Sequence, residues 1–215
     1  MIIHAKICGL STRETVKAAV DAGASHLGFV FFAKSPRNIS PEQVAELCRD
    51  IPLSVIKTGV FVDPENEQLD RILAMAPLDL LQLHGSESPA RVQEVKARFK
   101  RPVMKAIALS DPDDMAGIKA YESCADMLLF DAKAPPELTD ALPGGNGRAF
   151  DWNIIHAAEI NLPWMLSGGL NMDNIAEAIA ISGAQMIDVS SGVESRPGQK
   201  DIAKIKAFMN KVNSL

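Results

Sequence analysis

The stretch Ile2-Ile3-His4-Ala5-Lys6-Ile7-Cys8, near the start of the chain, is a short apolar run that ends in a thiol. A second run, Met127-Leu128-Leu129-Phe130-Asp131, has the same form and ends in a carboxylate. Continuous apolar runs of this length are typical of parallel strands that are buried on both faces. A thiol and a carboxylate at the carboxyl ends of such strands suit proton transfer to and from a molecule that lies between them.

Similar runs recur along all 215 residues and alternate with helical patterns. We predict eight strands, the last being the shortest: Ile2–Ile7, His26–Phe32, Ser54–Val62, Asp79–Leu83, Pro102–Ile107, Met127–Asp131, Pro163–Ser167 and Gln185–Val189. Between them, a capping residue followed by proline marks several helix starts. These pairs are Ser40-Pro41, Asp63-Pro64, Ser88-Pro89 and Asp111-Pro112, and the last predicted helix spans Asp201–Val212.

Eight strand–helix units in this length average roughly 27 residues each, which is compact for a (β/α)₈ barrel. The competing fold is a doubly wound open sheet, which usually has fewer strands and ends on edge strands. No linker-like stretch divides the chain. The segment richest in proline and glycine, Ala134–Ala149, follows the sixth strand and is predicted to be an active-site loop. We therefore predict an α/β protein with a TIM barrel fold, as a single domain over residues 1–215.

Composition excludes several classes of partner. The formal net charge is -5 and no basic stripe is present, so we expect no nucleic-acid or membrane partner, although a small anionic substrate remains compatible. The first residues lack the features of a signal peptide, and no apolar run approaches the ~20 residues of a membrane span. We expect a cytoplasmic protein in which the other two cysteines, Cys48 and Cys124, are packing residues. The sequence leaves the oligomeric state open.

Two small, glycine-rich segments follow the seventh and eighth predicted strands. They are Ser167-Gly168-Gly169-Leu170-Asn171 and Ser190-Ser191-Gly192-Val193-Glu194, and each precedes a predicted helix start. Glycines let backbone N–H groups approach an oxyanion, and barrels often bind phosphate at this place. We predict a phosphate site formed by both segments; the alternative is two tight turns without a ligand.

Four further polar residues fall on or near the carboxyl ends of predicted strands. Arg37 follows the second strand and suits a substrate carboxylate, or is a solvated surface residue. His84 ends the fourth strand as a substrate contact or a structural histidine. Side-chain alternation places Lys6 one layer below Cys8, where it should favour the thiolate. Asp188 on the eighth strand is then its natural partner, unless it contacts the substrate directly.

No metal or nucleotide motif stands out. The four histidines lack ligand spacing, and neither a dinucleotide-binding nor a P-loop pattern is present. We therefore expect neither a metal nor a cofactor.

These residues lead to a family. Over essentially its whole length the chain resembles the phosphoribosylanthranilate isomerases of tryptophan biosynthesis. The matching segments, in order, are Lys6–Leu10, Gly28–Phe31 with Ser35–Arg37, Gly59–Val62, Leu81–Gly85, Leu129–Asp131, Phe150–Trp152, Ser167–Leu170 and Asp188–Glu194.

The resemblance implies a barrel that converts N-(5′-phosphoribosyl)anthranilate to an aminoketose by an Amadori rearrangement, without a cofactor. Cys8 would be the general base and Asp131 the general acid. Substrate contacts would come from Arg37 to the anthranilate carboxylate, from His84, and from Gly168, Gly169, Ser190, Ser191 and Gly192 at the phosphate. One departure is Asn146, where the family usually has threonine, so the role of its loop is left open.

Two other functions remain as alternatives. The first is another sugar-phosphate isomerase or epimerase on the same barrel, using a metal and not needing Cys8. The second is a barrel that binds a phosphorylated ligand without turning it over. Activity on a related histidine-pathway substrate is also compatible with the sequence.

Overall fold

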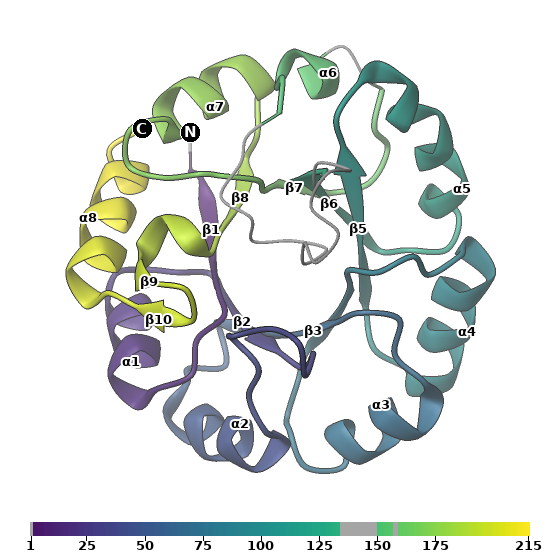
Figure 1. Ribbon diagram of the computed structural model, residues 1–215, viewed down its shortest axis with the longest axis horizontal. Coiled ribbons are helices and arrows are strands. Elements are labelled where there is room, and N and C mark those ends of the chain that lie inside the picture. The colour runs from purple at the N-terminus through teal and green to yellow at the C-terminus, as the bar shows by residue number, and fades with distance from the viewer. Residues whose placement is uncertain (1, 134–149, 157–158) are drawn as a thin grey trace.

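A computed structural model describes residues 2–133, 150–156 and 159–215 and contains a closed ring of eight parallel strands. Each strand pairs with the next along the chain, and the eighth closes on the first. The view down the ring shows the helices arranged around its outside (Figure 1). The predicted (β/α)₈ barrel is confirmed, and the open sheet is excluded.

All eight predicted strands are present, with ends that move by at most two residues. They are β1 (His4–Cys8), β2 (His26–Val30), β3 (Ile56–Phe61), β4 (Leu80–Leu83), β5 (Val103–Leu109), β6 (Met127–Ala132), β7 (Trp164–Leu166) and β8 (Met186–Val189).

The helices that follow them are α1 (Arg13–Asp21), α2 (Pro41–Leu47) with the short η1 (Cys48–Asp50), α3 (Asn66–Leu73), α4 (Pro89–Phe99), η2 (Pro112–Gly117) with α5 (Ile118–Glu122), α6 (Asn153–His156), α7 (Ile175–Ser182) and α8 (Ile202–Asn213). Within the described part of the chain, no helix is long and apolar enough to cross a membrane.

The predicted helix caps are only partly confirmed. The Ser40 hydroxyl accepts from the backbone N–H of Gln43, and the Gln43 side-chain oxygen accepts from the Ser40 N–H. Asp111 begins a 3-10 helix rather than an α-helix. The predicted cap at Asp63 is wrong, because α3 begins at Asn66 and the Asp63 carboxylate accepts from the Ser86 N–H of a neighbouring loop.

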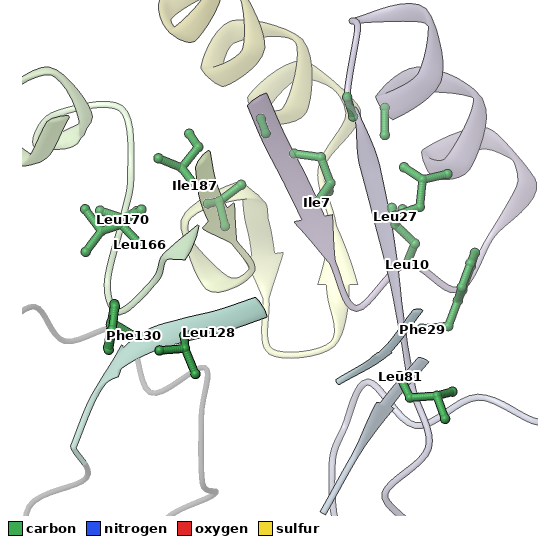
Figure 2. Packing of buried hydrophobic residues seen from close by; sticks show 14 of the residues in the cluster. Ile7, Leu10, Leu27, Phe29, Leu81, Leu128, Phe130, Leu166, Leu170 and Ile187 are labelled. Atoms are coloured by element: carbon green, nitrogen blue, oxygen red, sulfur yellow. The ribbon is translucent and has the colours of Figure 1, made fainter. Parts of the chain in front are cut away.

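Apolar side chains of the described residues form three clusters, of which the smallest is Cys8, Val30 and Val60. The largest cluster lies between strands and helices and contains residues such as Ile7, Leu27 and Ile187 (Figure 2). A smaller cluster fills the inside of the barrel: Leu80, Met104, Ala106, Met127, Leu129 and Met165. Each such side chain contributes roughly 1.5–3 kcal/mol when it is fully buried.

The connection after β8 differs from the prediction. The segment leads not into a helix but into one 3-10 turn, η3 (Ser191–Val193), and then a hairpin of β9 (Glu194–Arg196) and β10 (Gln199–Lys200). Only then does α8 begin, capped by the Asp201 side chain. Pairing between residues inside one short loop leaves little trace in the apolar pattern, so the hairpin was not predicted.

Candidate active site

A cleft of about 670 Å³, including its open mouth, lies at the carboxyl ends of the strands. Nine of the eleven residues predicted for the site line it: Cys8, Arg37, His84, Asp131, Gly168, Gly169, Asp188, Ser190 and Ser191. Lys6 and Gly192 are not in its lining. Most of the predicted residues are thus brought together in one cleft, and the contacts among them decide what it can do.

Cys8 ends β1 above a buried ion pair. The Lys6 ammonium, with none of its residue exposed, donates to the Asp188 carboxylate at 3.0 Å because β1 and β8 pair Lys6 with Asp188. The predicted pairing is therefore found. Burial raises the pKa of the Cys8 thiol, and the Lys6 ammonium offsets only part of this rise. Lys6 therefore acts in the expected direction, but Asp188 opposes it and burial outweighs it.

Asp131 ends β6 with both of its oxygens in hydrogen-bond contact. One accepts from the Ala132 N–H at 2.9 Å, and the other lies 3.1 Å from Nε2 of His84. The other ring nitrogen of His84, Nδ1, lies 2.7 Å from the side-chain amide nitrogen of Gln82. If the amide donates to Nδ1, the ring carries its hydrogen on Nε2 and donates it to Asp131. His84 is therefore a partner of Asp131 as well as part of the cleft wall.

The segments after β7 and β8 are packed against each other at the edge of the cleft. Gly168 and Gly169 have φ of 88° and 63°, in the left-handed region that favours glycine. Gly192 has no such backbone, but a Cβ there would lie 2.1 Å from the carbonyl oxygen of Leu170. Among described residues, the N–H groups of Gly168 and Gly169 have no hydrogen-bond partner. The geometry suits an anion held by backbone donors.

Arg37 is buried in an ion cluster and is not a solvated surface residue. Its Nε and Nη2 donate to the two carboxylate oxygens of Glu194 at 2.8 and 3.0 Å. Lys200 donates to the same carboxylate at 2.6 Å. The attraction of Arg37 and Lys200 outweighs the effect of burial and lowers the pKa of Glu194. The guanidinium thus reaches the cleft with its plane fixed by Glu194.

Three residues near the site were missed by sequence reasoning. Gln82 could have been found, because it precedes His84 by two positions and must share its face of the strand. Glu194 and Lys200 gave no comparable signal, since the hairpin that joins them was not predicted. Neither is in the cleft lining, although each contacts a residue that is.

Two predictions fall elsewhere. The segment Ala134–Ala149, with Asn146, lies outside the described residues. Cys48 and Cys124 are buried away from the cleft, as expected, and burial raises the pKa of Cys48 to about 11. In residues 2–133, 150–156 and 159–215, no group of three or more His, Cys, Asp or Glu side chains is placed to hold a metal ion.

Comparison with known proteins gives one consistent result. The family model for N-(5′-phosphoribosyl)anthranilate (PRA) isomerase matches residues 5–211. A protein of that name from Paracoccus denitrificans is 52% identical over 209 residues, which are 97% of this chain and 96% of the relative. A second, from Parvibaculum lavamentivorans, is 50% identical over 97% of both chains.

Solved structures agree. The chain superposes on phosphoribosyl anthranilate isomerase from Thermotoga maritima with a TM-score of 0.88 and 34% identity, covering all of both chains. Another structure of the isomerase holds reduced 1-(o-carboxyphenylamino)-1-deoxyribulose 5-phosphate, with a TM-score of 0.85, 33% identity and full coverage of both chains.

Proposed function

The chain belongs to the N-(5′-phosphoribosyl)anthranilate isomerases of tryptophan biosynthesis, and from that premise we propose that Cys8 is its general base and Asp131 its general acid. The observation that carries this proposal is their placement in one cleft, from strands that lie across the barrel. A sugar bound between them meets an acid on one side and a base on the other. The phosphorylated substrate would fill the cleft with its phosphate at the segments after β7 and β8.

The first step is opening of the furanose ring. Asp131, when protonated, transfers its proton to the ring oxygen as the C1′–O bond breaks. The lone pair of the anthranilate nitrogen moves in to form an iminium. The carboxylate left on Asp131 is stabilised by the Ala132 N–H and by His84, which lie 2.9 and 3.1 Å from its two oxygens.

The second step is removal of the C2′ proton. The positive nitrogen of the iminium makes this proton acidic, and the Cys8 thiolate accepts it. The electron pair flows to the nitrogen to give an enol-amine, which tautomerises to the ketone. Although burial raises the pKa of the thiol, the iminium brings a positive charge into the cleft only when the base is needed. The substrate's own nitrogen is the electron sink, so the rearrangement requires no cofactor.

The proposal predicts a loss of turnover, with binding retained, for substitution of either catalytic side chain. Asp131→Asn keeps size and polarity but has no proton to donate, and Cys8→Ser replaces a thiol by a much weaker acid. Each should lower kcat by about 10²–10⁴-fold, the usual worth of one positioned acid or base. Each should still bind the reduced product analogue in calorimetric titration. Turnover within tenfold of wild type would show that the substituted residue does not have its assigned role.

Arg37 is proposed to bind the anthranilate carboxylate, which its fixed guanidinium can meet within the cleft. Arg37→Ala should weaken binding of the reduced product analogue by about 1.5–3 kcal/mol, the cost of a lost hydrogen bond to a charged group. An analogue with the carboxylate replaced by hydrogen should bind wild type and variant with nearly equal affinity. Equal weakening of the two ligands would contradict the assignment.

A further inference from the structure

The β9–β10 hairpin carries a buried cation that the proposed reaction does not use. The hairpin is seen between α8 and the centre of the barrel (Figure 1). The side chain of Lys200, at its end, is only 1% exposed. Besides the carboxylate of Glu194, its ammonium donates to the carbonyl and to the hydroxyl oxygen of Ser190 at 3.0 and 3.1 Å.

These contacts bring Lys200 next to the end of β1. The Ser190 hydroxyl donates to the backbone carbonyl of Cys8 at 3.1 Å. One residue therefore separates the Lys200 ammonium from the residue proposed as the base. Because Ser190 also lines the cleft, Lys200 lies directly behind the wall that a substrate would touch.

The two buried cations near Cys8 are not equivalent. Lys6 is matched one-to-one by Asp188. Lys200 and Arg37 instead both donate to the one carboxylate of Glu194. A buried charge acts strongly on nearby ionisable groups, because little solvent screens it.

Cys8 has few other charged neighbours in the described structure. Lys6 lies on its own strand, Asp188 on β8, and Lys200 on β10, while β2 places uncharged Gly28 opposite it. Lys6 and Lys200 lower the pKa of the thiol and Asp188 raises it, against the larger rise due to burial. Lys200 thus adds a second positive charge near the thiol, from a different element than Lys6.

We propose that Lys200 is a positioning residue that acts through electrostatics and through Ser190 to favour the thiolate of Cys8, and that Glu194 limits the strength of this effect. The proposal rests on the proposed role of Cys8 as general base. It assigns the hairpin a part in the reaction, although neither Lys200 nor Glu194 lines the cleft.

The test is the pH dependence of Cys8 alkylation by iodoacetamide in the substrate-free protein, with the modified residue mapped by mass spectrometry. Lys200→Met keeps the length of the side chain and removes its charge. It should move the inflection to higher pH and slow alkylation at pH 7 by about three- to tenfold, because only the thiolate reacts. Lys200→Arg should restore the wild-type profile, and Lys206→Met, on the exposed face of α8, should not change it.

Glu194→Gln separates an electrostatic role from a structural one. It removes a negative charge from the same cluster, so the alkylation rate at pH 7 should equal or exceed that of wild type. Slower alkylation in both Lys200→Met and Glu194→Gln would indicate general loosening of the hairpin and would overturn the proposal. So would a wild-type profile in Lys200→Met. If Lys200→Met fails to fold, slower Cys8 alkylation in Glu194→Gln than in wild type is enough to overturn the proposal.

The alkylation rate does not depend on turnover, so the role of Lys200 can be tested separately from the role of Cys8 as base. Should Cys8→Ser retain activity, the assigned base is wrong, whatever the alkylation profiles show. When Cys8 is the base and Lys200→Met leaves its profile unchanged, only the role of Lys200 is wrong. Where both hold, kcat of Lys200→Met should fall with the thiolate fraction.

Discussion

At the scale of single residues, Gln82 is a buried side chain outside the cleft lining that contacts His84, the partner of the proposed acid Asp131. It is fully buried inside the barrel, and its amide nitrogen lies 2.7 Å from Nδ1 of His84. Its amide oxygen has no hydrogen-bond partner among the described residues. Such a group costs free energy when buried, so its retention points to the contact with His84. If the amide donates to Nδ1, Gln82 keeps the ring hydrogen on Nε2, the nitrogen that faces Asp131.

Gln82→Met should lower kcat by roughly tenfold with little change in KM, because the ring is then free to rotate and to change tautomer beside Asp131. The ¹⁵N chemical shifts of the His84 ring report the tautomer directly and should show a mixture in the variant. Thr58→Val is the matched control, since the Thr58 hydroxyl is likewise buried without a partner in the described structure but has no contact with His84. A wild-type kcat in Gln82→Met would show that Gln82 does not control the His84 tautomer in a way that affects turnover.

Residue-level reasoning from the sequence succeeded where alternation alone decides. Lys6 had to point inward below Cys8, and Asp188 had to meet it once β8 closed on β1. It could not identify Glu194 as the partner of Arg37, because Glu194 is 157 positions away on a hairpin with no apolar pattern. The ion pair of Lys6 is a consequence of strand register, whereas that of Arg37 is a consequence of loop conformation.

At the scale of elements, the segments after β7 and β8 behave as one unit. Gly192 packs against the Leu170 carbonyl, so the position of each segment at the edge of the cleft depends on that of the other. Strand order predicted that they would be neighbours. It could not predict that Gly192 lies behind the proposed phosphate site while Gly168 and Gly169 line the cleft.

Gly192→Ala should therefore raise KM for the phosphorylated substrate by about tenfold or more, because the new methyl forces the two segments apart and misplaces their N–H donors. The affinity for inorganic phosphate should fall in parallel. Gly117→Ala provides the control, since a Cβ there meets nothing within 4 Å. Ser191→Ala should be mild if backbone groups bind most of the phosphate. A wild-type KM in Gly192→Ala would show that the two segments move independently.

At the scale of the whole molecule, the cleft lies at one end of the barrel and an apolar plug fills part of its interior. The plug contains Met104 and Leu129. His26 begins β2 at the end of the barrel opposite the cleft, with only 7% of its surface exposed. Burial, together with the nearby charge of Lys6, lowers the pKa of His26 to about 4. The folded barrel therefore holds this histidine neutral.

This histidine should make the fold sensitive to mild acid. In the unfolded chain it binds a proton near pH 6.5, whereas in the folded chain it does so only near pH 4. Between these values the unfolded state binds more protons, so the free energy of unfolding falls as pH falls. The full contribution is present above pH 6.5 and amounts to at most about 3 kcal/mol, lost by about pH 4. His26→Gln, which does not titrate, should lose less stability than wild type over this range.

Urea unfolding of wild type and His26→Gln at intervals from pH 7 to pH 4 measures the difference. Carboxylates that lose their partners in acid contribute equally to both proteins and cancel in the comparison. His156→Gln, at an exposed site on α6, should follow the wild-type curve. Parallel curves for wild type and His26→Gln would show that His26 titrates in the folded barrel as it does in the unfolded chain. The acid sensitivity would then have to come from the buried ion pairs at the other end of the strands.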